Sequence, residues 1–459
     1  MNGVPRPHRL PVRFASAAAA AAALVGASRT AAADHSLQAL TTLTTGYTDN
    51  VQAVPDNPAD PTVTPSVQSD AFANIAPGII FSHEGTRITQ VLRYTLSIRL
   101  YADQSGANSF SNNLLYGAVV PLTPRSGLNF DLSAGHGRQN AFETVAQDTP
   151  IIGQPNGDQA YAQAAAGLSY NYQLTRSWQY QQSIGASIYQ PIDDTSTVGR
   201  RTAGTGSIGI AKTFNYHSFT LNGRGTYSVL DTGEDEDGVE LEDQKTILLG
   251  PELRWVHDIN QDFSTDASVG VTVTFPVGEF QDREVFPVGA AYLRWARDRY
   301  AAAAGYRRSV ATNIVLGETE ATHVGEVRGV VPIPLAEKLS MAGAVGYSDG
   351  RSIGILTASG EEAEGRTKQW IFDISASWQA TDAISTALRY QRVWQDRRDP
   401  RLMELGGTSD EQRTRRQQIT IVLEGRWPTR QAVEMPKDSS SRVDAGLDSM
   451  SRREESLVK

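Results

Sequence analysis

Residues 417–427, QQITIVLEGRW, carry the pattern that decides the fold. The odd-numbered positions are apolar or glycine: Ile419, Ile421, Leu423, Gly425 and Trp427. The even-numbered positions are mostly polar: Gln418, Thr420, Val422, Glu424 and Arg426. Because successive side chains of a β-strand point to opposite faces, one face of this strand is apolar and the other is polar. A run of this kind that ends on an aromatic residue is typical of a transmembrane β-barrel strand, with lipid on one face and a lumen on the other.

The first 33 residues have the organisation of a secretory signal peptide. Three arginines precede an Ala-rich apolar run at residues 14–25, and small residues around Ala33 offer a cleavage site. The run is shorter than the roughly 20 residues that a membrane-spanning helix needs. We therefore expect an exported chain that begins near Asp34, with an N-terminal membrane anchor as the alternative.

Segments with strand character follow as far as Trp427, separated alternately by short and long connections. The clearest early segment is 86–101, whose apolar and polar residues alternate almost without a break. Short turns are expected near 123–126, 174–177, 215–217, 258–261, 297–298, 334–337 and 381–382. Longer polar loops are expected at 50–68, 102–111, 138–158, 190–201, 231–245, 277–283, 311–318, 351–365 and 397–413.

This rhythm predicts an all-β fold: an antiparallel up-and-down transmembrane β-barrel over residues 34–427, with about 18 strands (16–18). Short periplasmic turns and long extracellular loops place such a barrel in the outer membrane of a Gram-negative bacterium, among its lipids and lipopolysaccharide. A soluble secreted β-protein is the alternative. Residues 428–459 begin with Pro428 and are rich in charge and serine, so we expect a disordered periplasmic tail, with a docking segment as the alternative.

All seven tryptophans fall at the ends of the expected strands, where an amphipathic ring favours the membrane interface. The predicted interface girdle consists of Trp178, Trp255, Trp295, Trp370, Trp378, Trp394 and Trp427. A soluble β-sandwich would bury several of them at mid-strand, so their positions favour the membrane barrel.

The alternation of residues also predicts which charged side chains line the lumen. The predicted set is Arg87, Arg93, Arg99, Arg224, Glu252, Arg254, Arg307, Glu326, Arg328, Asp373, Arg389, Glu424 and Arg426, with Asp131 and Asp266 on the same face. Arginine exceeds carboxylate there, although the whole chain has a formal net charge of −9. One interpretation is a pore that favours anions, because fixed positive charge lowers the barrier for anions in a confined channel. The other is a mesh of ion pairs that stiffens the wall.

Other kinds of chemistry have little support. The chain has no cysteine, which excludes disulfides, thiolate metal sites and Cys-attached haem. Carboxylates crowd residues 231–243, but their spacing differs from that of an EF-hand, so a solvated loop is expected and a divalent-cation site is the alternative. The histidines are scattered, and His217-Ser218 falls in a turn, so we expect no enzyme activity, cofactor or bound metal. No strongly basic patch suggests nucleic-acid binding.

The residues GYTDNV at 46–51, followed by Phe72 and IAPGIIF at 75–81, close the first expected strand and form the second. This opening resembles that of the β-barrel porin-like proteins found with exopolysaccharide gene clusters. The resemblance covers about the first 100 mature residues and implies export of an extracellular or capsular polysaccharide, with a periplasmic polysaccharide export protein as partner. Sugar-lined pores usually carry inward aromatics, whereas the alternation here puts only Tyr101, and with it Trp295, inside. A diffusion porin for small anions and a structural or adhesive barrel therefore stay open as alternatives.

Overall fold

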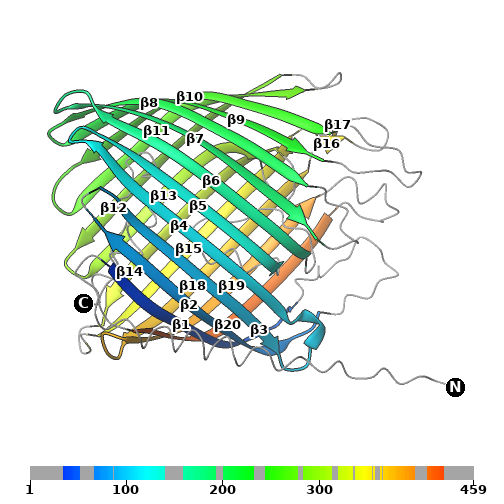
Figure 1. Cartoon of the computed structure of the whole chain (residues 1–459). Helices are drawn as coiled ribbons and strands as arrows, with labels where there is room; N and C mark the ends of the chain where they lie inside the picture. The colour runs from blue at the N-terminus through cyan, green and yellow to red at the C-terminus, as the bar shows by residue number, and fades with distance from the viewer. Residues whose placement is uncertain are drawn as a thin grey trace.

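The computed structural model describes residues 35–51, 67–85, 87–139, 159–192, 200–231, 243–277, 283–312, 319–333, 336, 338–353, 355–356, 362–363, 365–398 and 411–427. The described strands form one closed, antiparallel, 18-stranded β-barrel (Figure 1). The expected fold class and strand number are confirmed. The signal peptide, the tail after Trp427 and most of the acidic loop lie outside the described residues.

Each barrel strand pairs with the next one in the chain, and the last pairs with the first. The strands are β1 (His35–Thr48), β2 (Asp70–Glu84), β3 (Thr89–Tyr101), β4 (Ser109–Thr123), β5 (Ser126–Gln139), β6 (Gln159–Gln173), β7 (Trp178–Pro191), β8 (Arg201–Phe214), β9 (His217–Leu230), β10 (Gln244–Asp258), β11 (Phe263–Val277), β12 (Glu284–Arg297), β13 (Tyr300–Thr312), β14 (Thr319–Pro332), β15 (Leu339–Ile353), β18 (Arg366–Gln379), β19 (Ile384–Arg398) and β20 (Glu411–Trp427). A separate two-stranded hairpin, β16 (Ile355–Leu356) and β17 (Glu362–Ala363), lies between β15 and β18, and η1 (Ser105–Ala107) follows β3.

The two ends of the barrel differ in the length of their connections. At one end, here called the short-turn end, two residues join β4 to β5 and two join β12 to β13. The second of these turns holds Asp298 at φ 51°, a left-handed conformation that aspartate tolerates. At the other end, the long-loop end, 21 residues (49–69) separate β1 from β2. No helix among the described residues is long and apolar enough to cross a membrane.

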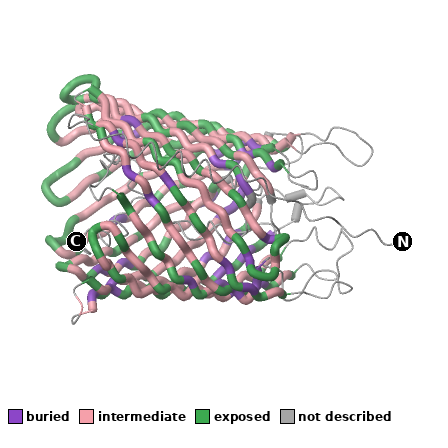
Figure 2. The backbone as a smooth tube through the Cα atoms, turned by 60° about the horizontal axis from the view of Figure 1, so that its bottom comes forward, coloured by how far each residue is buried: buried purple, intermediate pink, exposed green. Residues whose placement is uncertain are grey.

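The alternation in β20 separates two faces of the wall. Ile419, Ile421, Leu423 and Trp427 have exposed fractions of 50%, 54%, 44% and 61%, whereas Thr420 between them is 6% exposed. Figure 2 shows exposed residues alternating along the strands with residues of intermediate exposure and a few buried ones. The apolar side chains form the outer surface, and the cross-strand register carries this assignment around the whole barrel, because directly paired residues point to the same side.

Residues of the motif at 46–51 stabilise the pairing of β1 with β20, the seam at which the first and last strands close the barrel. Asp49 accepts a 2.6 Å hydrogen bond through Oδ1 from the backbone N–H of Gln417, and Asn50 donates through Nδ2 to the carbonyl of Arg415 at 3.1 Å. The Arg416 guanidinium donates to the Thr48 hydroxyl at 3.1 Å. These bonds extend the β1–β20 pairing past the end of β1 and hold the long-loop end of the seam closed.

Glycine at position 305 leaves room for an inward tyrosine. Tyr292 lies directly opposite Gly305 in the register, and a Cβ atom at 305 would collide with the Tyr292 ring. The ring therefore lies flat across the neighbouring strand only because residue 305 has no side chain.

We expect Gly305→Val to destabilise the barrel by about 1–3 kcal/mol, because the Tyr292 ring must leave its position. The readout is the urea midpoint of heat-modifiable gel migration of the refolded protein. Gly325→Val is the matched control: it lies on the outer face of the adjacent strand, and a Cβ there meets nothing within 4 Å. Equal midpoints for the two variants would contradict the packing argument.

Candidate functional site

The inward face of the barrel gathers nearly all of the charged residues expected there. The register places these residues inside: Arg93, Arg99, Asp131, Arg224, Glu252, Arg254, Asp266, Arg307, Glu326, Arg328, Asp373, Arg389, Glu424 and Arg426. Arg87 is the exception. Because β3 begins at Thr89 and not at residue 86, Arg87 lies exposed in the turn between β2 and β3.

Several inward charges were missed by sequence reasoning. They are Arg201, Arg294, Glu320, Arg397 and Arg416. Most fall where strands extend further toward the long-loop end than expected: Arg201 starts β8, and β20 begins six residues before Gln417. On β12 the expected faces were shifted by one residue. Trp295 was placed on the inner face, but it faces outward opposite Phe263, and Arg294 faces inward.

Seven of these inward charges form ion pairs within the wall. Arg254 donates two hydrogen bonds to the Asp266 carboxylate, at 2.8 and 2.5 Å, and Arg294 approaches the same carboxylate at 3.3 Å. Arg389 pairs with Asp373, and Arg426 with Glu424 at 2.7 Å. The ion-pair interpretation therefore describes this part of the wall.

Two inward arginines are different. Within the part of the chain that the structure describes, Arg93 and Arg224 have no hydrogen-bond or ion-pair partner. Arg224 lies near mid-strand on β9, and Arg93 lies nearer the short-turn end of β3. Their charge is available to a solute in the lumen, so the wall combines an ion-paired mesh with unneutralised positive charge.

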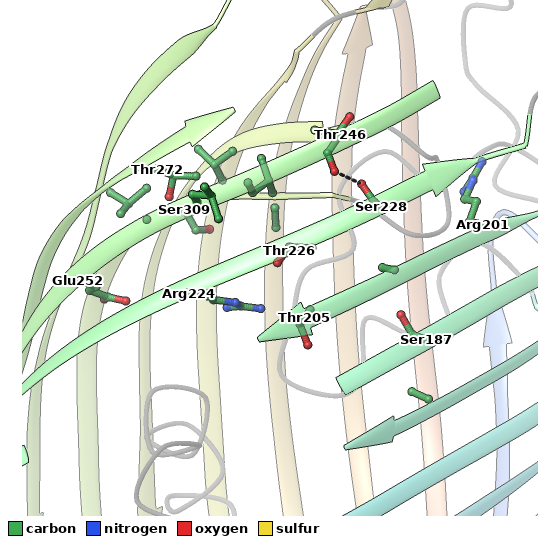
Figure 3. A pocket seen from close by; sticks show the side chains of 18 of the residues that line it. Ser187, Arg201, Thr205, Arg224, Thr226, Ser228, Thr246, Glu252, Thr272 and Ser309 are labelled. Atoms are coloured by element: carbon green, nitrogen blue, oxygen red, sulfur yellow. Dashed lines mark hydrogen bonds between the residues drawn. The ribbon is translucent and has the colours of Figure 1, made fainter. Parts of the chain in front are cut away.

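The wall around Arg224 is rich in hydroxyl groups and forms a concavity of about 590 Å³ (Figure 3). Its polar lining comes from strands between β5 and β13 and includes Ser187, Arg201, Thr205, Arg224, Thr226, Ser228, Thr246, Glu252, Thr272 and Ser309. Short hydroxyl side chains can donate and accept hydrogen bonds without filling the lumen. An 18-stranded barrel is also too wide for its side chains to fill. The inner surface around Arg224 is thus a hydroxyl-rich wall.

More aromatic rings point inward than the sequence analysis placed there. Tyr101 faces inward as expected, and the register adds Phe72, Tyr161, Tyr189, Phe286 and Tyr292. Arg99 lies over the Phe72 ring at 4.8 Å, and Arg201 over the Tyr189 ring at 5.9 Å. Tyr189 is only 1% exposed and Phe72 4%, so these two rings brace arginines and are not open stacking platforms for a sugar.

The seven tryptophans all face outward and lie near strand ends. Trp178, Trp255, Trp295, Trp378 and Trp427 are at the short-turn end, and Trp370 and Trp394 are paired neighbours toward the long-loop end. His217 stacks on His257 on this outer face, while Ser218 points inward, so the two adjacent residues do not form a catalytic pair. No cluster of three metal-ligating side chains occurs among the described residues.

No family model matches the chain, and no curated protein matches it. Similar solved structures include the alcaligin outer-membrane receptor FauA of Bordetella pertussis, with 11% identity and a TM-score of 0.44 over 85% of this chain and 76% of that one. OpdK of Pseudomonas aeruginosa has 11% identity and a TM-score of 0.42 over 85% and 99%. OccK2 of the same organism, solved with glucuronate, has 9% identity and a TM-score of 0.44 over 86% and 96%. These low scores do not assign the chain to a family.

We expect Asp266→Ala to lower stability by about 3 kcal/mol, because it leaves two inward guanidiniums without their shared carboxylate. Asp266 and Arg254 have side-chain exposures of only 7% and 12%. Asp396→Ala is the control, since its carboxylate is 68% exposed and 3.7 Å from Arg413. Urea titration of the folded barrel gives the loss in free energy of unfolding for each variant. A loss for Asp266→Ala no larger than that for Asp396→Ala would contradict a structural role for the ion pairs of Asp266.

Proposed function

We propose that this chain is an integral outer-membrane channel that passes hydrophilic molecules through its lumen. The observation that carries the proposal is the division of the wall: apolar side chains outside, and arginine, hydroxyl and amide side chains inside. Trp370 and Trp378 mark the two ends of the apolar band on β18. Their eight-residue separation is about 26 Å along the strand, which a strand tilt of about 40° reduces to a height of about 20 Å, a few ångströms less than the roughly 25 Å apolar band of an outer-membrane barrel.

Within that function, we propose an acidic extracellular or capsular polysaccharide as the cargo. Unneutralised Arg93 and Arg224 favour an anionic solute, and the hydroxyl-rich wall near Arg224 suits a hydrated sugar chain. The resemblance of residues 46–51 and 72–81 to porin-like proteins of exopolysaccharide clusters supports the same cargo. It also supports a periplasmic export protein as partner at the short-turn end. The same arginines favour small anions in a diffusion porin, which is the second candidate.

We expect Arg93→Gln/Arg224→Gln to reduce the anion preference of the channel. The measurement is the reversal potential in planar bilayers under a tenfold KCl gradient, with the mature chain refolded from denaturant. The anion-to-cation permeability ratio should fall at least twofold, whereas Lys245→Gln, on the outer face, should leave it unchanged. A ratio unaffected by the double variant would show that these two arginines do not select the solute.

The effect of added polymer on the current distinguishes an acidic polysaccharide from small anions as the cargo. If the chain exports an acidic polymer, long uronate chains added on the short-turn side should block the wild-type conductance in a length-dependent manner. The double variant should need at least several-fold more polymer, because two cationic contacts are lost. Passage of chloride with no block by long chains would instead favour the diffusion porin. A sealed barrel without any conductance would favour the structural or adhesive alternative.

A further inference from the structure

A continuous row of ionisable side chains crosses the outer face near the long-loop end, on the strands from β13 to β20. Its members are directly paired neighbours on six successive barrel strands: Arg308, His323, Asp349, Lys368, Asp396 and Arg413. Each lies within four residues of the long-loop end of its strand. Four of these six strands, β15, β18, β19 and β20, lie side by side in Figure 1.

Cations dominate this region of the surface. Arg351, Arg366, Arg392, Arg398 and Arg415 also face outward beside the row, so among the described strand residues eight cationic side chains accompany three carboxylates, those of Asp349, Asp396 and Glu411. We call this set of eleven side chains the outer basic patch. Asp349 is engaged by Arg366 at 2.8 and 2.6 Å, but Arg413 lies 3.7 Å from Asp396 and 4.0 Å from Glu411. The carboxylates therefore leave a surplus of exposed positive charge.

The described part of the rest of the barrel has fewer outward cations at the same height. Near the long-loop end of β2 to β12, Lys245 is the one cationic strand residue among the described outward side chains, and Arg283, which directly precedes β12, lies 5.2 Å from the outward Phe275 ring. The neighbouring strands present apolar groups there, such as Phe110 on β4, Ile188 on β7 and Phe275 on β11. The basic patch is thus a property of one side of the barrel and not of every strand end.

The layer directly below the patch is aromatic. Tyr306, Tyr347, Trp370 and Trp394 occupy the outward positions two residues closer to the short-turn end, and the Tyr347 and Trp370 rings lie 4.6 Å apart. On the last two strands the cations reach into the aromatic layer: Arg415 lies directly opposite Trp394, and Arg392, two residues nearer mid-wall, carries its guanidinium 4.4 Å from the Trp394 ring. On β13, β15 and β18 the order from mid-wall outward is apolar, aromatic and then charged. That is the order of a membrane's hydrocarbon, interface and anionic headgroup layers.

We propose that the outer basic patch binds a phosphorylated glycolipid of the outer leaflet, with acyl chains along the apolar wall and phosphates on the cations. The inference rests on the proposed membrane location. Arginine and lysine side chains that converge from adjacent strands can contact several oxygens of one phosphorylated headgroup. The aromatic row below supplies a flat surface for the base of the headgroup. A free anion would gain nothing from this row, so the whole arrangement favours a lipid over soluble phosphate.

The test uses native mass spectrometry of the refolded mature chain in detergent, with bisphosphorylated lipid A as probe. The patch variant is Lys368→Gln/Arg413→Gln/Arg415→Gln. The control, Arg125→Gln/Arg176→Gln/Lys338→Gln, removes the same charge from turns at the short-turn end. Arg308→Gln/Arg351→Gln is a second patch variant, for use if the first does not refold to a heat-modifiable barrel.

We expect the wild type and the control to retain bisphosphorylated lipid A at least tenfold more than its dephosphorylated form, and the patch variant to lose most of that difference. Inorganic phosphate at millimolar concentration should not displace the lipid. Retention by the patch variants equal to that of the control, or displacement by phosphate, would overturn the proposal. Conductance in the same preparations distinguishes failure of the channel proposal from failure of the lipid-site proposal. Selective lipid retention without current refutes the channel and leaves the lipid site standing. Current without selective lipid retention refutes the lipid site and leaves the channel standing.

Discussion

Closure of the sheet is the constraint on which the rest of the structure depends. A strand edge exposed to lipid would leave backbone N–H and C=O groups without partners, so a spanning sheet must return to its first strand. Here β20 pairs with β1 over ten residue pairs. Side chains of the motif at 46–51 add hydrogen bonds beyond them at the long-loop end. Once the ring is closed, every strand has an inside and an outside, and the chemistry of the two surfaces follows from the alternation of residues.

The inner and outer surfaces of the barrel differ in how their charged side chains are arranged. Inside, carboxylates hold many of the arginines in place, as Asp266 does for Arg254 and Arg294, and a minority are left to act on solutes. Outside, the described cations are most numerous on one side of the long-loop end, beside an aromatic row. A chain that is acidic overall therefore concentrates cations on its lumen face and on one sector of its outer face.

The fold was predictable because apolar and polar residues alternate along some 400 residues. This alternation is a local signal that can be seen in short runs such as 417–427. The identity of the inward face was likewise predictable wherever a strand was correctly bounded, as for Arg93 and Arg224. Errors arose where a strand was wrongly bounded or its alternation was misread. Arg87 belongs to a turn and not to a strand, and on β12 the inward residue is Arg294 and not Trp295. The seam and the outer basic patch were not predictable. Asn50 bonds the backbone of Arg415, 365 residues away, and the patch exists only through the register of six strands.

The absence of cysteine gives the central claim a direct test, since single cysteines can be introduced without removing any. Replace each of residues 418–423 in β20 with cysteine, reconstitute the barrels in liposomes, and measure the reaction rate with a charged, membrane-impermeant thiol reagent. An aqueous lumen predicts fast labelling at the inward positions Gln418 and Val422, and slow labelling at the lipid-facing positions Ile419, Ile421 and Leu423; Thr420, only 6% exposed, should label slowly because its neighbours cover it. Uniform rates, or faster labelling at the odd positions, would contradict a membrane barrel with a polar channel inside.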